Sequence, residues 1–245
     1  MSANQLLSAT ITSASLREPD SDGDTRLEGS LVLSSASDEC LELFITKQLL
    51  RGADGAVLSA STDEREDALD SGEELQLDLD SGYLKASLLN GTPNPLLQVE
   101  VLGCTSNYIQ LKPVQLGDGT PSLYGWHQPT QIGSSVIIES LAVSVGTVDD
   151  DGDVRIEIRA LVHNQSDQYV PRIAVKARAM ATGGREIDSS STEEKLRPSE
   201  TKVIELCFYS IKHNRLRGLA VSTEATVFAS SSSARCESEI EASQL

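Results

Sequence analysis

The segment that decides the fold is 149–168, DDDGDVRIEIRALVHNQSDQ, read beside 20–39, DSDGDTRLEGSLVLSSASDE. At an offset of about 129 residues, both contain an Asp-Gly-Asp turn, an Arg-apolar-Glu triplet and a Ser-Asp pair in the same order. Later segments continue the match: Gly55 with Gly184, 61–65 with 191–195 after a one-residue shift, and Leu75, Leu77 and Leu79 with Ile204, Leu206 and Phe208. This matched order of turns and apolar runs predicts two copies of one module.

Each copy has the alternation of a half-buried β-strand. VRIEIRA at 154–160, IAVKAR at 173–178 and ELQLDL at 74–79 alternate apolar with polar residues. Turn residues separate such runs every 8–15 residues or so, and no helical stripe persists over three turns. The sequence therefore predicts an all-β chain of two tandem immunoglobulin-like β-sandwich domains, derived from an internal repeat of about 129 residues.

The second copy resembles the small bacterial immunoglobulin-like sandwiches typified by FxLYD domains. The positions that carry the resemblance are Asn164, Ser166, Gly184, Pro198, Glu200 and the run 203–208. In the first copy Ser35 replaces the Asn and the turn 70–73 replaces the proline turn, and the motif that names the family is absent from both copies. The resemblance implies the fold, and an adhesive or scaffolding class of role.

The length of 245 residues suits two domains. We expect the first sandwich at 1–115, a linker at 116–133, and the second sandwich with a polar C-terminal tail at 134–245. The linker is rich in glycine and proline but holds Tyr124 and Trp126. These aromatic residues either fill a groove between the two domains or anchor another subunit, because Trp and Tyr dominate interface hot spots.

The charge excludes some classes of partner. With 37 acidic and 20 basic residues the net charge is -17, so nucleic acid would be repelled. No apolar run approaches the roughly 20 residues that a membrane helix needs, so we expect no membrane insertion. No export signal is readable, which makes the cytoplasm the default location, with an assembled particle or non-classical export as alternatives.

No motif of an enzyme is present, so we expect a non-enzymatic protein without a cofactor. The sequence lacks the nucleophile elbow, the zinc-protease pair and the phosphate-binding loop. The three histidines, His127, His163 and His213, are far apart in the sequence. We expect four reduced thiols, with a Cys207–Cys236 disulfide as the alternative; the other two cysteines are Cys40 and Cys104.

Two aspartate-rich turns are the candidate metal sites. Carboxylates at alternate positions around a glycine are ligands that Ca²⁺ accepts. Neither turn has the glutamate that an EF-hand places at its last position, and a solvated hairpin loop is the favoured interpretation. The candidate ligands are Asp20, Asp22 and Asp24 in the first copy and Asp149, Asp151 and Asp153 in the second.

Charge is distributed unevenly along the chain. The first 118 residues carry roughly -13 and the remainder roughly -4. If the strands 154–160 and 173–178 are neighbours in one sheet, four outward side chains form a basic patch: Arg155, Arg159, Lys176 and Arg178. An acidic first domain and this patch would then dock head to tail between copies. We therefore expect a structural or assembly protein that interacts through its sheet faces, edges and linker, with a protein partner or as a self-assembling subunit of a particle or filament. The first alternative is a module whose loops bind a separate protein or, less favoured because aromatic residues are few, a glycan. The second is a calcium-stabilised sandwich that uses the aspartate-rich turns.

Overall fold

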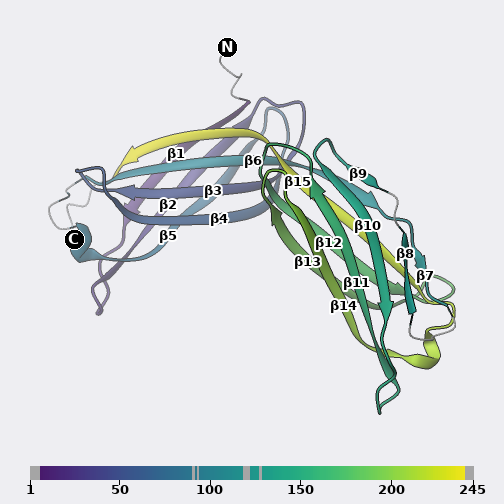
Figure 1. Ribbon diagram of the computed structural model, residues 1–245. Coiled ribbons are helices and arrows are strands. Elements are labelled where there is room, and N and C mark those ends of the chain that lie inside the picture. Colours follow the sequence, from purple (N-terminus) through teal and green to yellow (C-terminus); the bar gives the residue numbers. More distant parts are fainter. Residues whose placement is uncertain (1–5, 90–91, 93, 118–121, 127–128, 241–245) are drawn as a thin grey trace. The chain divides into compact units, whose positions relative to one another are not determined.

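The computed structural model describes residues 6–89, 92, 94–117, 122–126 and 129–240 (Figure 1). The chain forms two compact units, of which unit 1 comprises 1–105 with 230–245 and unit 2 comprises 106–229. These bounds differ from the expected ones. The expected linker, 116–133, lies inside unit 2, and the expected polar tail belongs to unit 1 from residue 230 onward.

Unit 1 contains two antiparallel sheets. The first has the order β1-β2-β5, made of β1 (Leu7–Leu16), β2 (Asp24–Ser35) and β5 (Glu74–Lys85). The second contains β4 (Val57–Leu69), β3 (Leu41–Arg51) and the unit 1 part of β6 (Leu96–Gln110), with the end of β15 (Ala220–Glu239) beside β6. A short 3-10 helix, η1 (Ala86–Leu89), follows β5.

Unit 2 has the same plan with additional short strands. Its first sheet has the order β14-β11-β10-β8, with β14 (Thr201–Lys212), β11 (Asp153–Asn164), β10 (Val136–Val145) and β8 (Ser122–Trp126); β9 (Thr130–Ile132) also pairs with β10. Its second sheet contains β13 (Glu186–Leu196), β12 (Val170–Met180), the start of β15 and β7 (Val114–Gln115). The helix η2 (His213–Arg215) follows β14.

The strands of the two units begin at a common spacing. β1 and β10 begin at Leu7 and Val136, and β2 and β11 begin at Asp24 and Asp153, in each case 129 residues apart (136 - 7 and 153 - 24). The spacing falls to 127 in β5 and β14. Leu31 lies opposite Leu77 and Ala160, 129 residues after Leu31, lies opposite Ile204. Leu77 rather than Leu75 therefore takes the place of Ile204, which corrects the alignment made from sequence.

Alternation along the strands builds one core in each unit. On β2 the side chains of Leu27, Leu31 and Leu33 are fully buried in the core of unit 1. The C-terminal segment contributes two side chains to the same core. These are Ala234, which is 5% exposed, and Ile240, which is 1% exposed. Burial of apolar surface is the main favourable term in folding, so the segment expected to be a tail is part of what holds unit 1 together.

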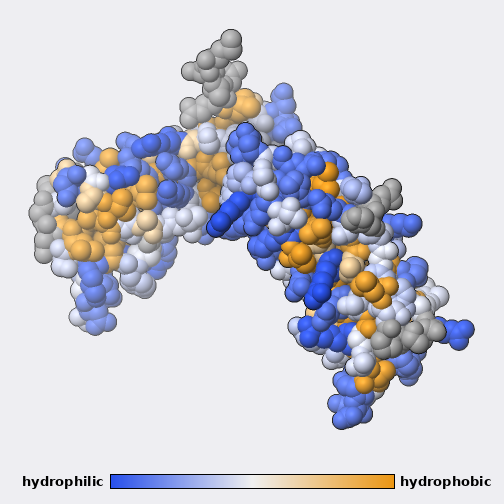
Figure 2. All heavy atoms as spheres, in the orientation of Figure 1, coloured by the Kyte–Doolittle hydropathy of each residue, from blue (hydrophilic) through white to orange (hydrophobic). Residues whose placement is uncertain are grey.

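The outer strands β4 and β13 are polar. Each lies at an end of its sheet order and carries a Ser-Thr-acidic run followed by a basic residue. Charges on an edge strand discourage uncontrolled pairing with other chains. On the face seen in Figure 2, apolar side chains occur as separate patches among polar ones. Among the described residues, no helix has the length and apolar character needed to cross a membrane.

Candidate interaction surface

The expected basic patch does not form, because β11 and β12 belong to different sheets. In this fold the chain crosses from one sheet to the other between these consecutive strands, so Arg155 and Arg159 are separated from Lys176 and Arg178. Arg178 donates two hydrogen bonds to Glu224, at 2.7 and 2.9 Å, across the β12–β15 ladder. This arginine is thus engaged within its own sheet.

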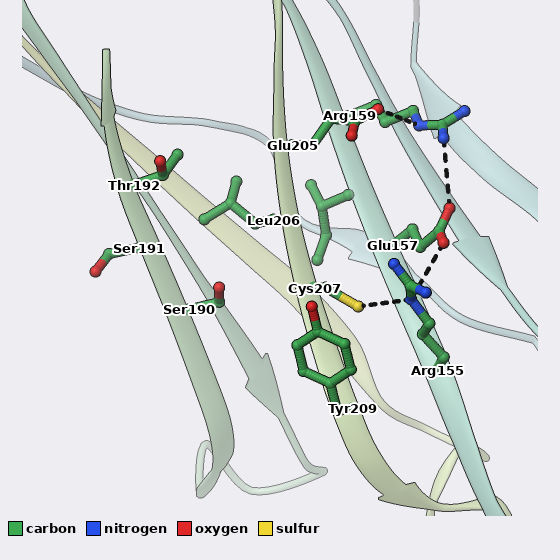
Figure 3. A pocket seen from close by; sticks show the side chains of 11 residues that line it. Arg155, Glu157, Arg159, Ser190, Ser191, Thr192, Glu205, Leu206, Cys207 and Tyr209 are labelled. Carbon is green, nitrogen blue, oxygen red and sulfur yellow. Dashed lines mark hydrogen bonds and ion pairs between the residues drawn. The ribbon is translucent and has the colours of Figure 1, made fainter.

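The outer face of β11 and β14 instead carries a mixed row of charges. The ladder places Glu157 opposite Cys207 and Arg159 opposite Glu205. Arg159 binds Glu205 at 3.0 Å and Glu157 at 3.6 Å, and Arg155 binds Glu157 at 3.2 Å (Figure 3). The charges compensate one another, so this face carries little net charge.

Arg155 also contacts a thiol and an aromatic ring. Its Nε donates a hydrogen bond to the Cys207 sulfur at 3.1 Å, and its guanidinium lies 5.4 Å from the centre of the Tyr209 ring. The hydrogen bond and the charge interaction with Cys207, and after them the charge of Glu157, raise the pKa of Arg155 above its ordinary value. Tyr209 remains 69% exposed. Tyr and Arg are both residue types enriched at the energetic centres of protein interfaces.

A groove of about 380 Å³ adjoins this pair, and we call it the β14 groove. Figure 3 shows β14 between the charged row on β11 and the hydroxyl side chains of β13. Between the groove and the β13–β14 turn, Lys202 binds Glu194 at 2.5 Å, which raises the pKa of Lys202. The lining residues are Arg155, Glu157, Ile158, Arg159, Ser190, Ser191, Thr192, Glu205, Leu206, Cys207 and Tyr209.

The corresponding place in unit 1 is bridged. Ser61 of β4 donates a hydrogen bond to the backbone oxygen of Asp80 of β5, at 3.4 Å. The ladders put Ser190 at the place of Ser61, and Cys207 at the place of Asp80. Among the described residues, Ser190 makes no such bond to Cys207. The hydrogen bond that links the edge strands β4 and β5 in unit 1 therefore has no counterpart at the matching position between the edge strands β13 and β14 of unit 2, within the part of the chain that the structure describes.

A second depression, of about 440 Å³, lies on unit 1 over β3, β6 and the end of β15. Its lining includes Ile45, Val101, Leu102 and Ala234. This depression is more aliphatic than the β14 groove.

The aspartate-rich turns are alike in both units. Asp20 accepts hydrogen bonds from the backbone N–H groups of Asp22 and Asp24, both at 2.9 Å. Lys85 binds the Asp24 carboxylate at 2.8 Å. In this turn the carboxylates of Asp20 and Asp24 are thus engaged by backbone N–H groups and by an ammonium group.

Unit 2 repeats this arrangement residue by residue. Asp149 accepts from Asp151 and Asp153 at 3.0 and 2.8 Å, and Lys212 binds Asp153 at 2.9 Å. Within the described ranges, no group of three or more His, Cys, Asp or Glu side chains is arranged to hold a metal ion.

Tyr124 and Trp126 lie on β8, at the edge of the first sheet of unit 2. Both pack against the core of unit 2, and the Trp126 indole N–H donates to the Lys112 backbone oxygen at 3.3 Å. Gly125 between them has φ +146, and a Cβ there would come 2.1 Å from the Leu141 backbone oxygen. The two rings thus belong to one unit, and the neighbour exposed on β8 is Leu123, at 75%.

The remaining chemistry-bearing residues are dispersed. No disulfide joins the four cysteines, all of which are described. His163 Nδ1 lies 2.8 Å from the Thr201 hydroxyl, His213 is in η2, and His127 lies outside the described residues. Sequence reasoning singled out Arg155 and Arg159 but missed Glu205, Cys207 and Tyr209. Their period-two spacing on β14 was the available signal, but the β11–β14 pairing was needed to use it.

Comparisons with known proteins place the chain in no family. No protein-family model and no curated protein sequence matches it. Among solved structures it is similar to pT26-6p, with 8% identity, a TM-score of 0.29 and coverage of 92% of this chain and 66% of that one. It is also similar to a bacterial adhesin from Mobiluncus mulieris, with 10% identity, a TM-score of 0.28 and coverage of 96% and 98%.

A third similar structure is red sea bream transglutaminase, with 8% identity and a TM-score of 0.24. The match covers 95% of this chain and 31% of the transglutaminase. The chain thus spans under two thirds of pT26-6p and about a third of the transglutaminase. At these TM-scores, the three similarities assign neither a family nor an activity.

Proposed function

We propose that this chain is a non-enzymatic structural or binding protein that works through protein–protein contacts made by unit 2. The observation that carries the proposal is the exposed Arg155–Tyr209 pair beside the β14 groove. Tyr and Arg supply large contact areas and directional donors, and they are over-represented among residues whose truncation weakens interfaces. The partner is either a second copy or a separate protein.

We further propose that the units are two copies of one module, related to FxLYD-type immunoglobulin-like domains. The common spacing of strand starts supports the duplication. The buried corner at Asn164 supports the relation, because the resemblance singled out this residue. Its Nδ2 donates to the backbone oxygens of Gln168 and Arg197, at 2.8 and 2.9 Å, and its Oδ1 accepts from the Ser166 backbone and hydroxyl.

The interaction proposal is tested by site-specific photo-crosslinking. A photoreactive phenylalanine analogue replaces Tyr209 in one variant and Tyr83 in the matched control, and the producing cells are irradiated. Tyr83 is equally suitable as a control because it is 72% exposed and lies 6.0 Å from the guanidinium of Arg26 in unit 1. We expect a discrete covalent adduct from position 209 and none from position 83. The same adducts from both positions, or none from either, would refute the proposal.

A further inference from the structure

We propose that the β14 groove of one copy binds the acidic edge strand β4 of a second copy. This inference rests on the proposed function and specifies the partner. β4 belongs to unit 1 and the groove to unit 2. The contact is therefore heterologous, so every copy that uses one of its two surfaces still has the other available.

The exposure of β4 makes it suited to this role. A strand on a sandwich normally alternates between buried and exposed residues, yet 62–66 are exposed without interruption. This stretch and the residue after it carry four carboxylates and one guanidinium: Asp63, Glu64, Arg65, Glu66 and Asp67. β4 is also the last strand in its sheet, so the backbone groups of its outer edge have no neighbouring strand in that sheet.

The groove offers a donor that suits a carboxylate. Both the hydrogen bond of Arg155 to Cys207 and its ion pair with Glu157 run through Nε. None of the described residues forms a hydrogen bond with the two terminal nitrogens of Arg155. A guanidinium can bind a carboxylate through two parallel hydrogen bonds, and its planar geometry gives that contact a direction.

The backbone of β14 offers the second component of the contact. β14 is the last strand of its sheet. Over the described parts of the chain, Ser190 forms no hydrogen bond to β14 like the one that Ser61 forms to the backbone of β5 in unit 1. An extended segment can add to such an edge through main-chain hydrogen bonds, while adjacent side chains give the selectivity. A single strand contact buries little area, so the association is expected to be weak and salt-dependent.

The test measures the weight-average mass of the full chain by sedimentation equilibrium, over a range of concentrations and at about 10 mM and 1 M salt. For the wild type at low salt, the mass should rise with concentration from 26.2 kDa through twice that value, and at high salt the rise should shrink. Arg155→Glu with Arg159→Glu should abolish the rise. Asp63→Lys with Glu64→Lys should do the same, because these two residues lie on opposite faces of β4 and at least one faces the groove.

The most decisive experiment mixes the groove variant with the strand variant. The groove variant and the strand variant, each monomeric alone, should associate when combined, since each then meets the opposite charge. The control is Arg185→Glu with Arg217→Glu, which makes the same change in net charge as the groove variant, but at exposed turn residues of unit 2, and should associate like the wild type. Thermal melting of every variant verifies that it is folded.

A wild type that stays at 26.2 kDa at all concentrations overturns this inference, as does a mixture that stays monomeric. Association that the groove variant does not weaken also overturns it. If self-association fails in this way but position 209 still crosslinks to a different protein, the proposed function stands. Failure of this inference can therefore be told apart from failure of the proposed function.

Discussion

Asp80 of unit 1 and Cys207 of unit 2 occupy the same place in their sheets, each accepting a hydrogen bond from the Nε of the equivalent arginine. Arg26 donates to Asp80 at 2.9 Å and Arg155 donates to Cys207 at 3.1 Å. In unit 1 this contact is an ion pair and its Arg is matched by a full negative charge. In unit 2 a thiol replaces the carboxylate, and Arg155 contacts both Cys207 and Glu157 through Nε, which leaves its terminal nitrogens for a partner.

This difference predicts an acid dependence that belongs to unit 1. The hydrogen bond from Arg26 holds the pKa of Asp80 below its ordinary value. The stabilisation is therefore complete above the unfolded-state pKa of about 3.9 and is lost as the pH falls through the lowered folded-state pKa. Asp80→Asn should lower the Tm by about 1–3 °C at neutral pH, a difference that shrinks below about pH 4.

The reciprocal change is Cys207→Asp, which should raise the Tm at neutral pH and add acid sensitivity. Scanning calorimetry from about pH 3 to pH 7 measures both variants. A constant offset between Asp80→Asn and the wild type at every pH would contradict the ion-pair explanation.

The buried corner at Asn164 should be the most sensitive polar site of unit 2. Asn164 is 0% exposed and joins the β11–β12 turn to the β13–β14 turn. Asn164→Ala removes all four hydrogen bonds of this fully buried amide and leaves a small void, so we expect a loss of about 3 kcal/mol in the free energy of unfolding. Ser35, at the corresponding corner of unit 1, accepts one bond from the Ser37 N–H, and Ser35→Ala should cost about 1 kcal/mol. Equal losses in urea denaturation would show that the Asn bonds are not the cause.

Gln48 is a polar residue whose replacement should stabilise unit 1. It is 2% exposed, and its Oε1 has no hydrogen-bond partner among the described residues. Gln48→Met keeps the volume and removes the unpaired group, so we expect a gain of about 1 kcal/mol in unfolding free energy. Gln98→Met is the contrasting variant, because Gln98 binds both Arg51 and Glu237, at 2.6 and 2.8 Å, and its loss should destabilise. A loss of stability in Gln48→Met would show that the amide is paired in solution.

Removing the end of β15 should unfold unit 1 selectively. Truncation after Ala229 deletes Ala234 and Ile240 from the unit 1 core and the bond from the Ile240 N–H to the Pro95 oxygen, at 3.0 Å. Hydrogen exchange measured by mass spectrometry should show protection lost over 6–105 and kept over 106–229. A point variant, Ile240→Asp, should act in the same direction, whereas Glu239→Lys, at an exposed position, should not. Unchanged exchange over 6–105 would refute this role of the segment.

Calcium should have no effect on stability. The carboxylates of Asp20 and Asp149 accept backbone N–H groups, and Lys85 and Lys212 bind the aspartates that close each turn. A cation would have to displace these partners before it gained its own ligands. Thermal melting with calcium added up to about 1 mM tests this, and a rise of several degrees would instead establish the calcium-stabilised alternative.

Strand content was readable from the sequence because the alternation on β11, β12 and β5 comes directly from one-sided burial. The offset of 129 residues is also the distance between the starts of β1 and β10 and of β2 and β11. The alignment of the two copies by sequence failed at β5. Unit 2 has two residues fewer before β14 than unit 1 has before β5, so the offset there is 127. Apolar alternation repeats every two residues, so a shift of two is invisible to it.

The candidate site was less predictable, for two physical reasons. Consecutive strands of a sandwich can belong to different sheets, as β11 and β12 do, so Arg155 was wrongly grouped with Lys176, although its ladder partners come from β14. The residues from 230 onward were expected to form a polar tail because small polar residues dominate there. Only the pairing beside β6 reveals that Ala234 and Ile240 face a core.

Unit 1 is built from two separate stretches of the chain, and this determines the order in which the two units are completed during synthesis. During translation, residues 1–105 leave the ribosome without their last strand, and unit 2 is complete before that strand emerges. At elongation rates of about 5–20 residues per second, the interval before Ile240 appears is roughly 7–27 s. Throughout that interval nascent unit 1 presents an incomplete sheet, so unit 1 starts to emerge before unit 2 and is completed after it.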